Sequence, residues 1–350
     1  MSDSDDRAAD IFKKAIVIDG HSDMLNDVME KRDMGETEVI ARRHLPRLKK
    51  GGCDGQIFAI YVEASFKPEM ALKRAIQLAD SFFLEIDEAD GKIMPCYTAD
   101  DFIRAKKEGK HAGLLGMEGA EAIASDVVWP SKKPPDMSRL HMFYQFGLRH
   151  IGFTWQQRNQ IADGVGEAKA NGGLTNFGVE LVKEVNNLGM VIDLAHIAQQ
   201  SYFDVMEETR DPVIVSHTNC MEVWNHERCI TDEQIHALAE NDGVMGVCFY
   251  PAIVDEKNPS VEKVLDHVDH VVQLVGANHV GWGADFADYI NWSPNEVGPD
   301  IEEKPKTRGL EDVTKLPNFV KGLIERGYSD EDIIKILGGN FLRVFKKVLS

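Results

Sequence analysis

The sequence predicts an α/β protein with a barrel of the (β/α)8 type. Strand-like apolar runs alternate with helix-like segments along almost the whole chain, and about eight strand candidates can be counted. This alternation is typical of βαβ units that build a parallel sheet, and about eight strands favour a closed barrel over an open sheet. The length of 350 residues, of which 43% are hydrophobic, suits such a barrel. We therefore expect a single barrel domain over residues 1–350.

The strand candidates are short runs rich in β-branched and other apolar residues. Strands of a parallel sheet are covered on both faces, so their sequences are nearly continuously hydrophobic rather than alternating. The runs that define the prediction are 16–23, 54–61, 111–118, 150–154, 189–196, 212–217 and 279–285.

Helical segments separate these strands. Apolar residues at helical spacing predict a helix over 68–88, and Thr175 is a suitable N-cap for a helix that ends at Gly189. The expected helices are 68–88, 140–146, 176–188, 199–209, 231–240, 260–274, 329–337 and 340–349. We expect the last two, which Gly338 and Gly339 split, to cover the barrel.

Three stretches break the alternation and are rich in glycine, proline or polar residues, namely 129–136, 156–173 and 291–308. Each follows a strand or lies between two units of the alternation. Catalytic and binding residues are often found on such loops, so each is a candidate active-site loop, although an ordinary surface loop explains any one of them equally well.

Charge and composition limit the partners of the protein. A formal net charge of −19 argues against nucleic acid and against an anionic membrane surface, since both require basic surfaces. The acidic N-terminus lacks the apolar core of a secretory signal, and no apolar run approaches the roughly 20 residues of a membrane helix. Five cysteines without C-x-x-C spacing suit reduced thiols. We therefore expect a cytoplasmic protein that binds a small molecule, with a homodimer left open.

His21 and Asp23 are the most informative residues of the chain, because they end the first apolar run as an H-x-D pair. Positions i and i+2 of an extended backbone point to the same side, so an imidazole and a carboxylate there can reach one metal ion. Barrel enzymes keep their chemistry just beyond the C-terminal ends of the strands. Alone, however, the motif is too frequent to prove a metal site.

Four other strand candidates also end in a side chain that can bind a metal. These side chains are Glu118, His196, His217 and Asp285. For each one alone, a hydrogen-bonded loop residue is the simpler explanation. Five coincidences at strand ends are much harder to explain in that way. Together they predict a metal site whose histidine and carboxylate ligands suit zinc or another borderline divalent ion.

Seven motifs occur in a characteristic order along nearly the whole chain, at 19–23, 116–119, 173–178, 189–196, 216–217, 279–286 and 336–345. Together they resemble the renal (membrane) dipeptidase family of the amidohydrolase superfamily. The resemblance implies a distorted (β/α)8 TIM-like barrel that holds two zinc ions per chain. It also implies that a hydroxide bridging the two metals hydrolyses the amide bond of a small dipeptide.

The resemblance implies a role for each metal-binding residue. His21 and Asp23 would bind one zinc ion. His196 and His217 would bind the other, and Glu118 would bridge the two. A carboxylate shared by two cations offsets part of their repulsion and holds them close together.

Two further residues would act on the substrate. Asp285 falls where the family keeps its general base, and a carboxylate there can take the proton of the nucleophile and deliver it to the leaving amine. Arg228, eleven residues beyond His217, matches an arginine that pairs with the carboxylate of the substrate. A guanidinium suits this task because it offers two parallel donors.

The sequence departs from the family at Trp155. Dipeptidases of the family carry a histidine after the threonine that ends the middle strand, and that histidine hydrogen-bonds the substrate near the scissile carbonyl. Here Trp155 follows Thr154, and an indole donates one hydrogen bond but cannot carry a proton. Trp155 could be a neutral donor or line the pocket wall. Alternatively, Asn159, Arg158 or His226 takes the place of the histidine, or the substrate is not an ordinary dipeptide.

The sequence leaves three functions open. The leading one is a binuclear zinc dipeptidase for small dipeptides, with a D-residue at the C-terminal side as one option. The second is a related amide or C–N hydrolase that acts on a non-peptide metabolite with a carboxylate, and Trp155 favours it. The third is a metal-binding protein without catalysis. The presence of Asp285 argues against this third function, because a structural metal site has no use for a free base.

Overall fold

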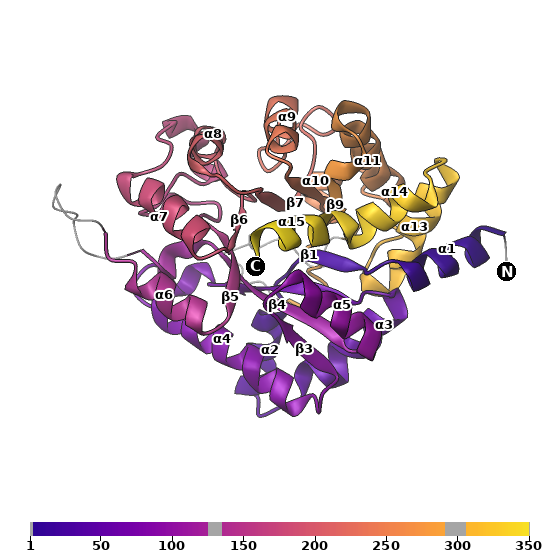
Figure 1. The fold of residues 1–350 in the computed structure, drawn as a ribbon, viewed down its shortest axis with the longest axis horizontal. Helices are drawn as coiled ribbons and strands as arrows, with labels where there is room; N and C mark the ends of the chain where they lie inside the picture. Colours follow the sequence, from indigo (N-terminus) through magenta and orange to yellow (C-terminus); the bar gives the residue numbers. More distant parts are fainter. Residues whose placement is uncertain (1–2, 125–134, 291–305, 350) are drawn as a thin grey trace.

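The computed structural model describes residues 3–124, 135–290 and 306–349, and its centre is a sheet of parallel strands (Figure 1). The order of hydrogen-bonded strands is β1-β2-β4-β5-β6-β7-β8-β9, and β3 pairs with β4 outside this path. These eight strands form a nearly closed barrel, which confirms the predicted fold. The strands are β1 (Ile18–Ser22), β2 (Gly55–Tyr61), β3 (Ile93–Cys96), β4 (His111–Glu118), β5 (Leu148–Gly152), β6 (Val191–Asp193), β7 (Ile214–Thr218), β8 (Val244–Val247) and β9 (Val280–Trp282).

Helices surround the barrel (Figure 1). The helix that was expected to begin at Thr175 does so, and the Thr175 side chain accepts a hydrogen bond from the backbone N–H of Gly178. The helices are α1 (Asp3–Lys14), α2 (Met24–Asp33), α3 (Leu45–Gly51), α4 (Ala71–Glu88), α5 (Ala99–Glu108), α6 (Ser138–Gln145), α7 (Asn176–Asn187), α8 (Gln199–Glu208), α9 (Asp232–Glu240), α10 (Pro251–Val254), α11 (Val261–Val275), α13 (Leu316–Glu325), α14 (Asp330–Ile334) and α15 (Asn340–Val348).

Strand β4 has an edge that two other strands share. Its first half, from His111 to Leu114, pairs with β3. Its second half, from Leu115 to Glu118, pairs with β5, while β2 runs along the opposite edge. Every residue of β2 and β4 is buried, as expected for strands covered on both faces. The change of partner along one edge contributes to the distortion of the barrel.

The barrel is completed between β1 and β9 by the side chain of Asp19. Its Oδ1 accepts hydrogen bonds from the backbone N–H groups of Ala284 at 2.9 Å and His21 at 3.2 Å. Burial raises the pKa of the Asp19 carboxyl to about 7. This contact ties the first strand to the residue that directly precedes Asp285.

Three glycines let β1, β8 and the end of β9 approach β7 inside the barrel. A Cβ atom at Gly20, Gly246 or Gly283 would lie 2.7, 2.0 or 2.0 Å from the backbone oxygen of Ser216. None of the three has a left-handed backbone, so the requirement is for space and not for conformational freedom. We call these residues the glycine collar. Around the Ser216 oxygen, the barrel therefore has no room for the methyl group of an alanine at any of these three positions.

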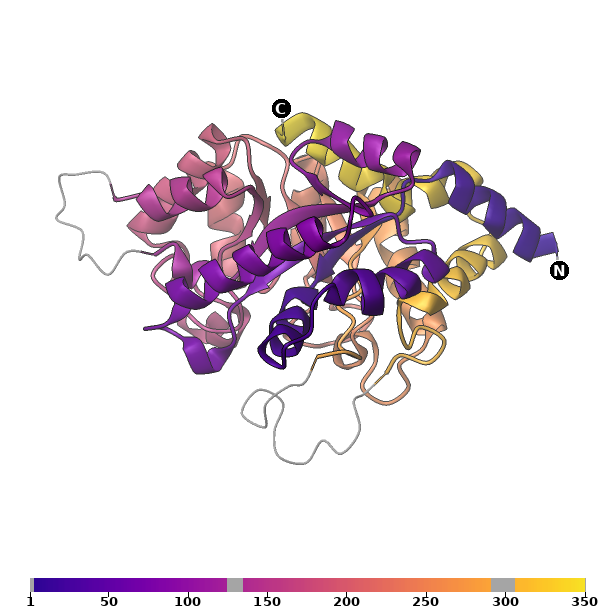
Figure 2. The same cartoon turned by 90° about the horizontal axis from the view of Figure 1, so that it is seen from below.

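The C-terminal helix α15 closes the end of the barrel at which the strands begin. The Phe341 ring lies against Gly20 and Gly281, and Phe345 packs against Phe102 of α5 with ring centroids 5.5 Å apart. In Figure 2, α15 (yellow) and α5 (purple) lie side by side at this end of the molecule. The prediction that C-terminal helices cover the barrel is therefore confirmed. Phe341 shares a buried cluster with residues from the first halves of the strands, namely Ile18, Ile57, Leu114, Val191, Ile214 and Val244.

The remaining predictions concern loops, thiols and membrane segments. Most of the predicted loops 129–136 and 291–308 lies outside the described residues, whereas 156–173 is described and contains a 3-10 turn at Val165–Ala170. Within residues 3–124, 135–290 and 306–349, no helix is both long and apolar enough to cross a membrane. The cysteines are free and buried: Cys53, Cys96, Cys220, Cys229 and Cys248.

Candidate metal and catalytic site

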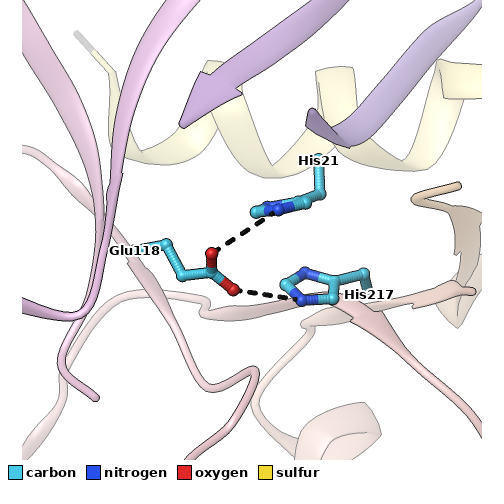
Figure 3. Close-up of side chains that lie close together, drawn as sticks. All are labelled: His21, Glu118 and His217. Carbon is cyan, nitrogen blue, oxygen red and sulfur yellow. Dashed lines mark ion pairs between the residues drawn. The ribbon is translucent and has the colours of Figure 1, made fainter. Parts of the chain in front are cut away.

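The five side chains predicted to bind metal meet at the C-terminal ends of the strands. Glu118, the last residue of β4, lies between His21 of β1 and His217 of β7 (Figure 3). Its Oε2 is 3.7 Å from His21 Nε2, and its Oε1 is 3.3 Å from His217 Nε2. The same Oε1 is 2.9 Å from Nε2 of His196, which follows β6. One carboxylate therefore has an oxygen facing each side of the cluster.

The ligands form two pairs that lie next to each other. Nε2 of His21 is 3.3 Å from Oδ1 of Asp23, and Nε2 of His196 is 2.9 Å from Nε2 of His217. The rings of His21 and His217 are only 3.9 Å apart between centroids. The glycine collar allows this approach, because it lets β1 come close to β7 directly below the two rings.

Several buried atoms of the cluster lack the hydrogen-bond partner that buried polar atoms normally have. They are His21 Nε2, Asp23 Oδ1 and His196 Nδ1. In addition, ligand atoms of His21, Glu118 and His217 lie within 4.8 Å of one another, as do those of His21, Asp23 and Asp285. Unsatisfied nitrogen and oxygen atoms at this spacing fit a divalent metal of the zinc type.

The pKa shifts of the proposed ligands run in different directions. Burial opposes protonation of His21, but the charges of Glu118 and Asp23 raise its pKa well above the usual value, and burial raises the pKa of Asp23 to about 7. Glu118 and His196 are shifted toward the forms that bind a metal. Burial opposes ionisation of Glu118, but His21 and His196 outweigh it and hold the pKa of the Glu118 carboxyl well below its usual range. Burial and the charge of Arg228 hold the pKa of His196 well below its usual value. An ionised carboxylate and a neutral imidazole can each donate a lone pair to a metal.

Two residues at the site have a left-handed backbone. The φ angles are 65° for His196 and 53° for Asp285, which lies three residues beyond β9. Residues other than glycine seldom adopt this conformation, and those that do are concentrated at functional sites. In both cases the unusual backbone occurs where a strand has ended and the side chain turns into the site.

Asp285 lies beside the ligands but is only half-buried. Burial raises the pKa of the hydroxyl of Tyr250, three residues beyond β8, and the charge of Asp285 adds to this shift. Sequence reasoning missed Tyr250. An aromatic residue with a hydroxyl just past a strand end was the available signal.

Arg228 is buried beside the histidines. Its Nη2 donates to the backbone oxygen of His217 at 3.2 Å, and its own backbone oxygen accepts from Thr218 Oγ1 at 2.8 Å. The bond to the backbone of His217 places the guanidinium next to the cluster, and its charge contributes, after burial, to lowering the pKa of His196. The loop after β7 thus brings a fixed positive charge to the site.

Trp155 lies at the wall of the site. Its ring centroid is 5.9 Å from that of His196 and 5.4 Å from that of Tyr61, the last residue of β2. The side chain is half-buried. Its position fits an aromatic wall, and direct contact with the substrate stays a prediction.

The other residues considered in place of the histidine of the family are engaged within their loops. Asn159 donates to the backbone oxygen of Phe153 at 2.7 Å and accepts two backbone N–H groups. Arg158 donates to Asp163 at 3.0 Å. His226 accepts a backbone N–H at 3.1 Å. Asn159 therefore holds the loop 156–173, and its role in substrate binding also stays a prediction.

A buried line of polar side chains lies behind His217. Ser216 Oγ is 2.8 Å from His217 Nδ1 and 2.5 Å from Asp193 Oδ2, and His150 Nε2 is 3.1 Å from the same Asp193 oxygen. Burial alone would raise the pKa of Asp193, but hydrogen bonding to His150 and the histidine charges hold it well below its usual value. Sequence reasoning assigned no chemical role to these residues. The sequence offered one sign that Asp193 lies near the site, because it ends a buried strand three residues before His196.

A parallel barrel with histidines and carboxylates gathered at its C-terminal end defines a metal-dependent hydrolase. The chain belongs to the membrane dipeptidase family, peptidase family M19, whose model it matches over residues 5–350. The protein is accordingly a metal-dependent dipeptidase, and the predicted family is confirmed.

Curated relatives and solved structures agree with this assignment. Dipeptidase aclJ of Aspergillus oryzae is 28% identical, over 97% of this chain and 79% of that protein. Dipeptidase tcpJ of Claviceps purpurea is 30% identical, over 94% and 76%. The crystal structure of the dipeptidase AC, a metallo peptidase of family M19, has a TM-score of 0.82 at 28% identity and covers 95% of this chain and 98% of that one. A metallo peptidase from Rhodobacter sphaeroides, liganded with a phosphinate mimic of the dipeptide L-Ala-D-Ala, has a TM-score of 0.81 at 27% identity, over 95% and 99%.

Proposed function

We propose that the protein is a binuclear zinc dipeptidase that hydrolyses small dipeptides. The observation that carries the proposal is the position of Glu118. Its Oε2 faces His21, the partner of Asp23, and its Oε1 faces His196 and His217. Glu118 would therefore bridge two ions, each held by one ligand pair. When bound, two zinc ions would lower the pKa of the attacking water and polarise the scissile carbonyl.

The remaining residues of the site would bind the substrate and move protons. Asp285 would take a proton from the attacking water and deliver it to the leaving amine. Arg228 would hold the C-terminal carboxylate of the substrate through paired hydrogen bonds. Because Arg228 lies beside His217, a carboxylate held there would be close to the scissile bond, and longer peptides would be poor substrates.

The proposal includes dipeptides with a D-residue at the C-terminal side. Its support is the Rhodobacter sphaeroides metallo peptidase, which was liganded with a mimic of L-Ala-D-Ala. A rate comparison of L-Ala-L-Ala with L-Ala-D-Ala tests this part. Hydrolysis of the L,L isomer alone would remove the D-residue from the proposal.

Zinc analysis of Glu118→Ala tests the bridge. The wild-type protein is expected to bind close to two zinc ions per chain. Loss of the shared carboxylate leaves the repulsion between the ions unscreened, so Glu118→Ala should lose both zinc and activity. Elemental analysis after dialysis against a weak chelator measures the content. Two fully occupied ions in Glu118→Ala would rule out the bridge.

A second experiment tests the carboxylate site. The wild-type protein should strongly prefer a dipeptide to its C-terminal amide, since truncation at a charge-assisted site costs a few kcal/mol. Arg228→Met should erase this preference, lower kcat/KM for the free acid and leave the zinc content intact. Equal wild-type rates on the acid and the amide would contradict the role of Arg228.

Trp155 supports a second candidate, in which the site cleaves a non-peptide amide or C–N bond in a metabolite that carries a carboxylate. An indole in place of an imidazole makes the pocket less polar beside His196. A screen of L,L-dipeptides, L,D-dipeptides and N-acyl amino acids separates the candidates. Faster hydrolysis of the N-acyl amino acids than of every dipeptide would favour the second one.

A further inference from the structure

We infer that His150, Asp193 and Ser216 are positioning residues that determine which ring nitrogen of His217 carries the proton. The inference rests on the proposed metal site, in which His217 is a ligand. All four side chains are buried, with exposures of 3% or less. They come from the neighbouring strands β5, β6 and β7, and they form a continuous line of hydrogen bonds that ends at His217.

The acceptor sites of Asp193 are all occupied by donors. Its Oδ1 accepts the backbone N–H groups of Ala195 at 3.0 Å and Ser216 at 2.8 Å. Its Oδ2 is reached by His150 Nε2 at 3.1 Å and by Ser216 Oγ at 2.5 Å. An ionised carboxylate has no proton to donate and acts as an acceptor only. The hydroxyl of Ser216 must therefore donate its proton to Asp193.

This assignment decides the proton of His217. A serine hydroxyl has one proton, and here Asp193 receives it. The Oγ of Ser216 can then only accept from His217 Nδ1, which lies 2.8 Å away. The ring proton is consequently on Nδ1, and the lone pair of Nε2 points toward Glu118. A histidine ligand whose second nitrogen donates to a fixed partner has a fixed tautomer and a fixed ring orientation.

Gly116 leaves space beside β4 for the His150 ring. A Cβ atom at Gly116 would lie 2.4 Å from His150 Nδ1, and this glycine does not have a left-handed backbone. It stands in β4, two residues before Glu118. The strand that supplies the proposed bridging carboxylate thus has a glycine where the His150 ring requires the space.

Histidine 15N spectra of the zinc-loaded wild-type protein test the tautomer directly. The spectrum should contain a His217 signal with a proton on Nδ1 and none on Nε2. A difference spectrum against His217→Gln assigns the signal. A proton on Nε2, or coordination of zinc through Nδ1, would overturn the inference.

Zinc affinity tests the line of hydrogen bonds. Ser216→Ala removes its central hydroxyl, and Ser81→Ala is a matched control, because the hydroxyl of this buried serine donates only to Leu78 within α4. In competition with a chelator, Ser216→Ala should bind one of two zinc ions 10 to 100-fold more weakly. Ser81→Ala should bind both as the wild-type protein does.

The outcomes separate this inference from the proposed function. If the wild-type protein does not bind zinc through His217, the proposed function fails. If it binds two ions and Ser216→Ala matches Ser81→Ala, only the positioning role fails. If Ser216→Ala does not fold, the wild-type spectrum decides the question alone.

Discussion

Asp285, the residue proposed to transfer protons, has an unusual position for a carboxylate of the barrel. It lies with His21 and Asp23 at the edge of the cluster, and it is partly open to solvent. The residue before it, Ala284, is held by Asp19. The backbone in front of Asp285 is therefore held in place, while its side chain stays partly open to solvent.

Asp285→Asn separates proton transfer from metal binding. An amide cannot accept and return a proton, so kcat should fall by about 10²-fold or more. The zinc content should stay close to that of the wild-type protein, because the proposed ligands are unchanged. Steady-state kinetics and metal analysis of the same preparation measure both effects, with the exposed Asp80→Asn as control. A near-normal kcat would assign the proton transfer to another group.

At the scale of single residues, the sequence predicted the side chains that meet in the candidate metal cluster. It did not predict the buried hydrogen-bonded residues next to His217. Strand ends in a parallel barrel all point to one face, so ligand-type residues at five strand ends could be placed together. The contact of Ser216 with Asp193 depends on strand register, which a single sequence does not specify. His150 carried no signal of such a role either, because it lies at the start of the predicted strand 150–154, away from the C-terminal end where the ligands gather.

At the level of elements, the long amphipathic helices and the apolar strands were predictable, and short elements were not. Helix α4 begins at Ala71 rather than at Pro68, within the usual uncertainty of a boundary. The predicted strand 150–154 ends at Gly152. Strand β3 has only four residues, one of which is Pro95, and proline is uncommon within strands, so it carried no signal.

The glycine collar gives a prediction for these elements. Gly246→Ala would place a methyl group 2.0 Å from the Ser216 oxygen, whereas at Gly152 the nearest atom would be 3.5 Å away. Overpacking of this kind costs about 1–3 kcal/mol or more. We expect Gly246→Ala to lower the free energy of unfolding by about 3 kcal/mol, and Gly152→Ala by less than about 1 kcal/mol. Urea denaturation measures both values, and equal losses would contradict the role of the collar.

At the scale of the whole molecule, we expect the stability at acid pH to depend on a buried neutral histidine, His267. In His267, Nδ1 accepts the backbone N–H of Cys220 at 3.2 Å, and Nε2 donates to the backbone oxygen of Val254 at 3.1 Å. Only a neutral ring can make both bonds. Burial lowers the pKa of His267 from 6.5 to about 4.

The sign of the pH dependence follows from this shift. As the pH falls below 6.5, the unfolded chain takes up a proton that folded His267 does not accept until about pH 4. The folded state therefore loses stability in this window, by up to about 3 kcal/mol at roughly 1.4 kcal/mol per pKa unit. His267→Asn should make the unfolding free energy fall less steeply between pH 6.5 and 4. The exposed His236→Gln should leave the slope unchanged, and an unchanged slope in His267→Asn would count against this account.

The alternation of strands and helices was enough to predict a barrel, but not how it closes. The seam between β1 and β9 depends on the carboxylate of Asp19, which in the sequence is only one more polar residue before an H-x-D pair. Whether a side chain can bridge β1 and β9 depends on the distance between these strands. Packing of the complete barrel sets that distance.

Phe341 and Phe345 of α15 help to close the end of the barrel at which the strands begin, and this has a consequence for how the protein is made. All the proposed metal ligands, from His21 to His217, and also Asp285, are synthesised before α15. A growing chain on the ribosome therefore contains the full set of ligands while the barrel beneath them still lacks the aromatic residues that fill it. We therefore expect metal loading in the native geometry to follow the release of α15 from the exit tunnel and its docking against the barrel.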